Sequence, residues 1–134
     1  MSDALSIAAS GMNVAALRLE VSARNIANMR SSGPMPTSSN PANFPPAYTP
    51  LRVNQTDVAG GGTTATVTPV TPAATPSYDP TAPFADDKGM VALPNVDVAD
   101  EIVGLISTRF AFAANAYVAR VDQKMMSSLL DVAT

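Results

Sequence analysis

The prolines of this 134-residue chain lie in its middle, and their placement limits where long helices can form. All 12 fall between Pro34 and Pro94. A proline inside a helix costs about 3 kcal/mol, because it removes a hydrogen bond and clashes with the preceding turn. The chain therefore divides into a front segment, residues 1–30, an extended arm, residues 31–94, and a back segment, residues 95–134. We expect long helices only in the front and back segments.

The front segment has the periodicity of a helix that packs against a partner helix. From about Ser2 to Asn28, apolar and small residues recur at alternating spacings of three and four, which is a heptad seam. The seam consists of Leu5, Ala8, Met12, Ala15, Leu19, Ser22, Ile26 and Met29. Gly11 lies inside the predicted helix and lowers its stability by about 1 kcal/mol relative to alanine. The breaker cluster Ser31-Ser32-Gly33-Pro34 ends the run.

The back segment predicts a longer helix, from about Asp97 to Val132, with two apolar stripes. Asp97 can cap its N-terminus, and Asp100 and Glu101 add negative charge to the first turn. One stripe contains Ile102, Leu105, Phe112, Ala116, Ala119, Met126 and Leu130, and the other contains Ile106, Phe110, Ala113, Tyr117, Val121, Met125 and Leu129. A surface helix needs one apolar stripe, so two stripes indicate burial from two sides. We expect neighbouring subunits to cover the second stripe.

The arm, residues 31–94, is rich in proline and threonine and has no helical period. Tyr48-Thr49-Pro50-Leu51-Arg52-Val53 and Thr64-Ala65-Thr66-Val67-Thr68 alternate weakly, and Gly60-Gly61-Gly62 lies between them. This pattern predicts a small proline-edged β-hairpin within extended chain laid over a neighbour. The expected fold is mainly α, with the N- and C-terminal helices paired as a coiled-coil-like core. Small residues bury little area, so we also expect the terminal segments to become ordered only on assembly.

The composition argues against several classes of function. The chain has no histidine and no cysteine, which removes the commonest general base, thiol nucleophiles and the usual transition-metal ligands. A net charge of −3 gives nucleic-acid binding no electrostatic support. Gly60-Gly61-Gly62 lacks the Gly-Lys-Ser/Thr continuation of a nucleotide loop and is interpreted as a flexible turn. We expect no catalytic, cofactor-binding or metal-binding residues.

Neither membrane insertion nor a cleavable secretory signal is expected. No stretch approaches about 18 consecutive apolar residues, which a transmembrane helix requires. Residues 1–11 lack the basic region and continuous apolar core of a signal peptide.

Short motifs at both ends resemble the flagellar axial proteins, the family of bacterial rod and hook subunits. The front motif is Ala8-Ala9-Ser10-Gly11-Met12 followed by Ser22-Ala23-Arg24-Asn25-Ile26-Ala27-Asn28. The back motif is Leu93-Pro94-Asn95-Val96-Asp97 followed by Glu101, Phe112, Asn115 and Met125-Met126. The resemblance covers about residues 5–30 and 77–130. Within the family it is greatest to proximal rod subunits, because the chain is short and has no inserted outer domain.

The resemblance implies a non-enzymatic structural subunit that self-assembles into a helical tube around the export channel and transmits torque. It implies export by the flagellar type III apparatus without cleavage, and a position in the periplasmic part of the basal body. The implied partners are copies of itself, other rod proteins and rod–ring junction proteins. It also adds Asn25, Asn28 and Asn115 to the stripe residues as packing residues. The resulting candidate subunit-packing residues are Leu5, Met12, Leu19, Asn25, Ile26, Asn28, Ile102, Leu105, Ile106, Phe110, Phe112, Asn115, Tyr117, Val121, Met125, Met126, Leu129 and Leu130.

Two other hypotheses remain open at this stage. The chain could be another axial or adaptor subunit of the flagellum, which its location along the shaft would reveal. It could instead be a secreted helical interaction protein outside the flagellum, and loss of its gene would then leave flagella normal. An enzyme is the weakest hypothesis, because only Asp, Lys or Tyr chemistry is open to it.

Overall fold

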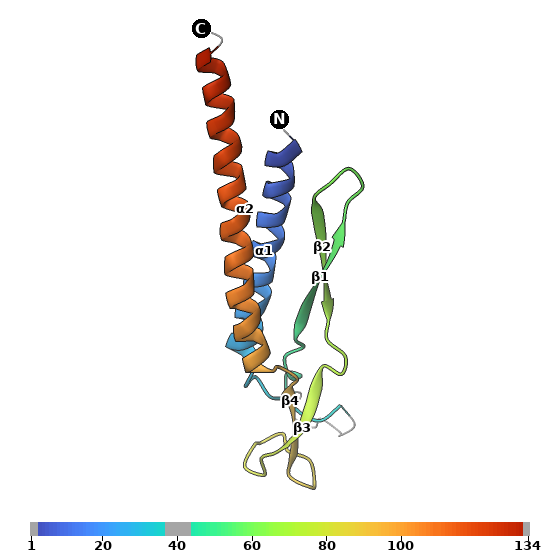
Figure 1. Ribbon diagram of the computed structural model, residues 1–134. Coiled ribbons are helices and arrows are strands. Elements are labelled where there is room, and N and C mark those ends of the chain that lie inside the picture. Colours follow the sequence, from blue (N-terminus) through green and yellow to red (C-terminus); the bar gives the residue numbers. More distant parts are fainter. Residues whose placement is uncertain (1–2, 37–43, 133–134) are drawn as a thin grey trace. The chain divides into compact units, whose positions relative to one another are not determined.

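The computed structural model describes residues 3–36 and 44–132, which form two long helices and four short strands (Figure 1). The helices are α1, Asp3–Asn28, and α2, Val98–Val132, each starting within a residue of its predicted start. The strands are β1, Leu51–Asp57, β2, Thr63–Pro69, β3, Ala74–Tyr78, and β4, Met90–Pro94. The prediction of two long terminal helices is confirmed.

The chain forms two compact units rather than one. Unit 1 is made from Met1–Glu20, Val53–Val67 and Val103–Thr134, and unit 2 from Val21–Arg52 and Thr68–Ile102. Each unit therefore combines part of both helices with part of the arm.

The predicted cap at Asp97 is present in unit 2, and so are capping bonds at the end of α1. The Asp97 carboxylate oxygen Oδ1 accepts hydrogen bonds from the backbone N–H groups of Ala99, at 2.8 Å, and Asp100, at 3.2 Å. These are donors at the start of α2 that have no partner inside the helix. At the end of α1, the Asn28 side-chain amide donates to the Arg24 carbonyl, and the Ser31 N–H donates to the Asn28 carbonyl.

The predicted β-hairpin is also present, as the neighbouring strands β1 and β2. Its turn is closed by two hydrogen bonds, from the Val58 N–H to the Gly62 carbonyl and from the Gly61 N–H to the Val58 carbonyl. The observed β1 starts three residues after the predicted start at Tyr48 and continues to Asp57, so the hairpin is longer than expected.

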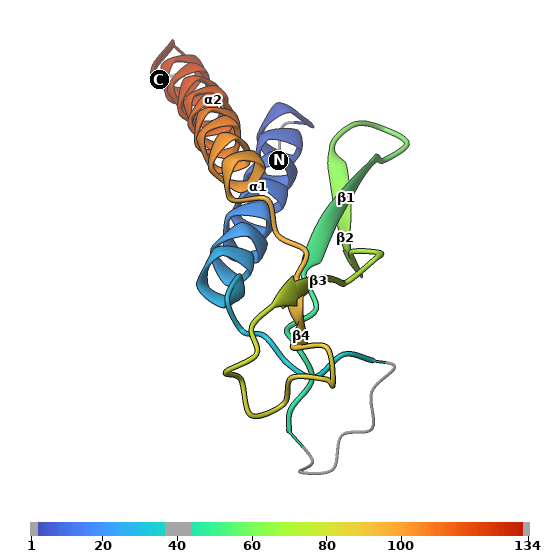
Figure 2. The same ribbon diagram turned by 90° about the horizontal axis from the view of Figure 1, so that it is seen from below.

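A second two-stranded sheet, formed by β3 and β4, is not predicted by the sequence pattern (Figure 2). The strands run antiparallel, with Pro76 opposite Ala92. The N–H and C=O of Ala92 both bond to Gly33, on the other side of β4, at 2.9 and 3.0 Å. Pro76 therefore lies where the ladder needs no N–H donor, which is why a strand containing proline is tolerated.

The buried apolar residues are small, as the composition implies. They are Ala8, Val14, Ala15, Val21, Val91 and Ala92. Among the described residues, the largest fully buried side chains are those of Asn25 and Pro50. An asparagine in that position must have its polar atoms bonded within the protein, because an unpaired buried amide is destabilising.

Gly33 occupies a crowded crossing in unit 2. A Cβ atom added to it would overlap the backbone nitrogen of Ala47 and lie 2.7 Å from the carbonyl carbon of Pro46. Backbone atoms of Pro45–Ala47 therefore approach Gly33 too closely for a side chain, while β4 is hydrogen-bonded to the Gly33 backbone.

We predict that Gly33→Ala lowers the free energy of unfolding by about 3 kcal/mol, because Gly33 cannot move away from Pro45–Ala47 without breaking its two hydrogen bonds to Ala92. Gly104→Ala is the matched control. A Cβ there meets nothing within 4 Å, and alanine raises helix propensity by about 1 kcal/mol. Urea unfolding of the purified chain measures both variants, and equal effects would contradict this account of Gly33.

Candidate assembly surface

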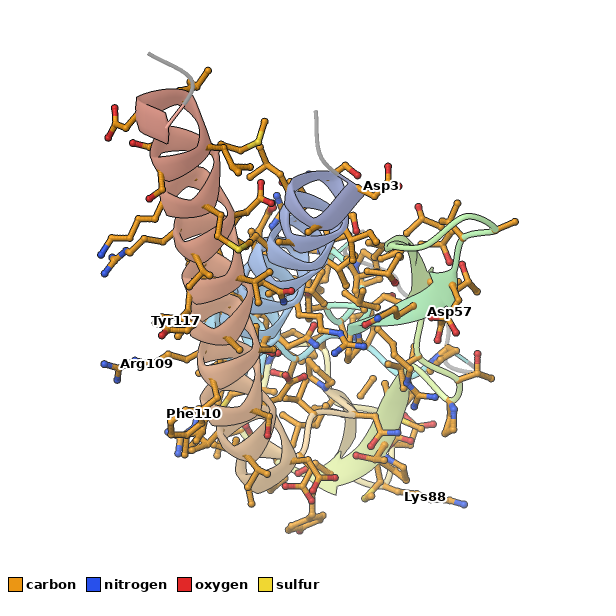
Figure 3. The ribbon with its side chains drawn as sticks, turned by 45° about the horizontal axis from the view of Figure 1, so that its top comes forward. Asp3, Asp57, Lys88, Arg109, Phe110 and Tyr117 are labelled. Carbon is orange, nitrogen blue, oxygen red and sulfur yellow. The ribbon has the colours of Figure 1, made fainter. Side chains whose placement is uncertain are left out.

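The large apolar side chains of α2 are exposed rather than buried. They define the outer face of α2, which consists of Ile102, Val103, Ile106, Phe110, Phe112, Tyr117, Val118, Met125, Met126, Leu129 and Leu130. Phe110 is 70% exposed and Tyr117 is 65% exposed. Figure 3 shows the side chains of Arg109, Phe110 and Tyr117 pointing away from α1. Both predicted stripes contribute to this face, so neither is buried by the chain itself.

The two buried positions of α2 are polar, and they belong to one polar heptad. Glu101, Thr108, Asn115 and Asp122 follow one another at intervals of seven residues. Thr108 and Asp122 are buried, at 7% and 8% exposure, and the other two are half-buried. A surface helix normally turns its apolar stripe inward. The chain half-covers Leu105, Ala116 and Ala119 of the first stripe and Val121 of the second, but the two most buried positions of α2 are polar.

The predicted seam of α1 is only partly covered. Ala8 and Ala15 are buried, whereas Leu19 is 50% exposed. Leu5, Met12, Ser22 and Ile26 are half-buried. Val14 and Val21, which lie outside the seam, are both buried. Burial on α1 thus extends to a second face that the heptad pattern did not reveal.

Gly11 and Asn115 bring α1 and α2 together in unit 1. A Cβ on Gly11 would lie 2.7–2.9 Å from the side-chain amide atoms of Asn115. The Asn115 amide also donates to the Ala111 carbonyl, at 2.9 Å, which holds it against its own helix. The glycine that weakens α1 is therefore the place where α1 admits a polar side chain from α2. Asn115, which the family resemblance suggested for subunit packing, lies against its own chain.

Asn25 is the centre of a hydrogen-bond network in unit 2, and it is 2% exposed. Its Nδ2 donates to the Leu51 carbonyl, at 2.8 Å, and to Glu101 Oε1, at 2.6 Å. Its Oδ1 accepts from the Leu51 N–H, at 3.0 Å, and from the Tyr48 hydroxyl, at 3.1 Å. Both donors and both acceptor sites of the amide are occupied, so none remains for a neighbouring subunit.

The Asn25 network joins three segments that are far apart in the sequence. The side-chain amide bonds both the N–H and the C=O of Leu51, much as a paired strand would, at the start of β1. The same amide reaches the first turn of α2 through Glu101. The network therefore determines where the arm and α2 leave the end of α1.

Tyr48 is the titratable group that this environment perturbs. Its burial raises the pKa of the phenol above the ordinary value of 10.0. The positive charge of Arg24 opposes this increase in pKa, and the negative charge of Glu101 adds to it. The protonated phenol is the form that donates to Asn25. Within the described ranges, no three His, Cys, Asp or Glu side chains gather as a metal ion would require.

Sequence reasoning missed the roles of Tyr48, Glu101 and Gly11 inside the chain. One signal was available for the network. Asparagine is a poor helix former unless it caps a helix, and Asn25 lies three residues before the end of α1 among small and apolar residues. Such a residue indicates a side chain that bonds backbone outside its helix.

We predict that Asn25→Ala lowers the free energy of unfolding by about 3 kcal/mol, because it leaves Glu101, Tyr48 and both polar groups of Leu51 without this partner. Asn28→Ala is the control, since it removes from the same helix an amide that bonds only the Arg24 carbonyl and the Ser31 hydroxyl, and it should cost about 1 kcal/mol. Denaturant unfolding of both variants measures this. Equal losses in the free energy of unfolding would contradict the stabilising role of the Asn25 network.

We also predict an alkaline loss of stability that depends on Tyr48. Because folding raises the pKa of the phenol, its stabilising contribution is complete below pH 10.0 and is lost as pH rises through the pKa of the folded state. Unfolding titrations from about pH 9 to about pH 12 should therefore show a steeper decline for the wild type than for Tyr48→Phe. Tyr117→Phe makes the same substitution outside the Asn25 network and serves as the control for the change of side chain. Parallel slopes for wild type and Tyr48→Phe would contradict the prediction.

Two helices are long and apolar enough to cross a membrane by length and composition alone. They are Asp3–Asn28 and Val98–Asp131. The core helix of a soluble protein and a signal sequence can meet the same criteria. Only 6% of the apolar window in α2 is buried within the chain, so the helix presents an apolar surface that something else can cover.

Comparison with known proteins places this surface in a family. The family described as flagellar basal body rod FlgEFG protein C-terminal matches residues 87–132, which contain β4 and α2. The chain is 34% identical to the flagellar basal-body rod protein FlgC of Escherichia coli O6:H1 over 130 residues, covering 92% of this chain and 91% of the relative.

Two further relatives carry the same name. FlgC of Borreliella burgdorferi is 30% identical, over 96% of this chain and 94% of its own length. FlgC of Agrobacterium fabrum is 29% identical, over 98% of this chain and 94% of its own length. Similarity of this extent includes both helices and the arm between them. The chain belongs to the FlgC family of flagellar basal-body rod proteins and is a structural subunit of the rod.

Proposed function

We propose that this subunit assembles with copies of itself and other proximal rod proteins into a helical tube, through the outer face of α2. The observation that carries the proposal is the exposure of that face along the whole helix, from Ile102 to Leu130. At 1.5 Å per residue this distance is about 42 Å. An apolar surface of that length is unusual for a monomer and is typical of an interface.

The mechanical role follows from the type of contact. Helices that interlock side chains along their length resist sliding, because each ridge of one helix lies in a groove of the next. A head-to-tail contact that does not close on itself builds a filament rather than a ring. Rod subunits joined in this way would transmit torque as a stiff shaft and leave a central channel for export.

Protein, rather than lipid, is the proposed cover of the outer face. Arg109 is exposed near the middle of the apolar run from Ile102 to Ala119. A bilayer would have to accept this guanidinium near its centre, at about 2.5–3.5 kcal/mol. A neighbouring subunit can offer a carboxylate or carbonyl oxygen to it instead.

The proposal includes a non-catalytic role, export without cleavage and a periplasmic position. The Asn25 network supports the first, because the amide at its centre has all of its donors and acceptors engaged in structural bonds. The similarity of both chain ends to axial proteins supports export by the flagellar type III apparatus. It also supports contacts with the rod–ring junction below and the distal rod above.

A deletion strain complemented with variants tests the interface. We predict that the double variant Phe110→Gln, Tyr117→Gln fails to restore hook, filament and swimming, because two of the most exposed apolar side chains are lost. Both are exposed, so the free energy of unfolding of the subunit should change by less than about 0.5 kcal/mol. Val67→Gln, which makes the same kind of apolar-to-Gln change at an exposed position outside α2, should restore swimming.

Electron microscopy of the cells and detergent-purified basal bodies provide the readouts. The wild-type chain should remain in basal bodies after the membranes are dissolved. Its complete release into detergent micelles would favour a lipid-covered helix. Normal flagella in the deletion strain would reject the rod function. Full swimming with the double variant would reject the outer face of α2 as the interface.

A further inference from the structure

The turn of the β1–β2 hairpin rests on the N-terminal half of α1, within unit 1. Figures 1 and 2 both show the turn beside this part of α1. The Thr63 N–H donates to the Ser10 hydroxyl oxygen, at 3.0 Å, and that hydroxyl donates to the Ile7 carbonyl, at 2.7 Å. One serine therefore links the hairpin backbone to the backbone of the helix.

The glycines of the turn make this contact possible. All three have φ values of 90–100°, which side-chain-bearing residues rarely adopt. A Cβ on Gly62 would lie 2.8 Å from the Ser10 hydroxyl oxygen and 3.8 Å from the Ile7 Cα. A Cβ on Gly60 would meet nothing within 4 Å. Gly62 is thus needed for close approach as well as for the turn, whereas Gly60 is needed for the turn alone.

The two helix ends in unit 1 differ in how much of the chain covers them. Ala8, Val14 and Ala15 on α1 are buried. Residues 123–131 of α2 are exposed at every position. We expected from the sequence that the terminal segments become ordered only on assembly, and this asymmetry raises the question of whether α1 and the end of α2 behave alike in the free subunit.

We propose that the β1–β2 hairpin is an intramolecular strap that orders the N-terminal half of α1 in the free subunit, before any partner binds. The glycine turn is the part of the strap that docks, and Ser10 is its anchor on the helix. The last turns of α2 have no equivalent strap among the described residues. The free subunit therefore carries a docked α1 and an exposed α2 end. This inference concerns the subunit alone and does not depend on the rod interface.

Amide hydrogen exchange of the purified full-length chain tests the anchor. In Ser10→Ala, the amides of Thr63 and of residues 7–14 should exchange about five- to tenfold faster than in the wild type, the effect of losing one such hydrogen bond. Ser6→Ala is the matched control, because the Ser6 hydroxyl makes the same kind of local bond, to the Asp3 carbonyl, one turn before Ser10 on α1. Its exchange in the same peptides should be unchanged.

A second pair of variants tests the docking turn. Gly60→Ala and Gly62→Ala impose the same left-handed backbone strain, but only the second adds a clash with Ser10. Gly62→Ala should accelerate exchange in residues 7–14, and Gly60→Ala should not. Equal acceleration by both, or fast exchange of these residues already in the wild type, would overturn the strap. The flagellar complementation described above would be unaffected by that result.

Discussion

The hydrogen bonds of the Asn25 side chain are the interaction on which unit 2 depends. One buried amide bonds both backbone groups of Leu51, the Glu101 carboxylate and the Tyr48 hydroxyl. Because an amide has fixed geometry, these four bonds hold the start of β1 and the first turn of α2 against the end of α1. A thin apolar core could not do this, since hydrophobic contact is not directional.

The chain uses polar and small residues for contacts within itself and leaves its large apolar residues outside. The internal contacts are the Asn25 network, the close approach of Gly11 to Asn115, the Ser10–Thr63 hydrogen bond and the Gly33–Ala92 bridge. The large apolar residues left exposed include Phe110, Tyr117 and Leu129. Specific internal bonds can hold the subunit's geometry, while apolar area stays available for association, where its burial is most favourable. The short motifs that resemble axial proteins contain Ser10, Gly11, Asn25 and Asn115, and each of these residues makes a contact within the chain.

Much of the secondary structure followed from local rules. Asp97 was predicted as a cap and is one, and the Pro94 boundary and the Gly60–Gly62 turn lie where the sequence indicated. The β3–β4 sheet did not follow, because a segment that contains a proline, here Pro76, is normally disfavoured as a strand. That argument fails when Ala92 turns its own backbone groups toward Gly33, a pairing between residues about sixty positions apart. The Gly60–Gly62 segment was predicted as a turn, but turn chemistry could not predict that the turn packs against Ser10 of α1.

By itself, the sequence determined where helices can exist, where they begin and end, and that more apolar surface is present than one short chain can bury. These properties are local or additive, so periodicity, proline placement and composition are sufficient. Only the tertiary structure decided which side of α2 faces inward, because two apolar stripes and one polar heptad are all compatible with the same helical period. It also decided that Asn25 and Asn115 bond within the chain. A contact between distant residues depends on how the segments pack, and no local pattern encodes that.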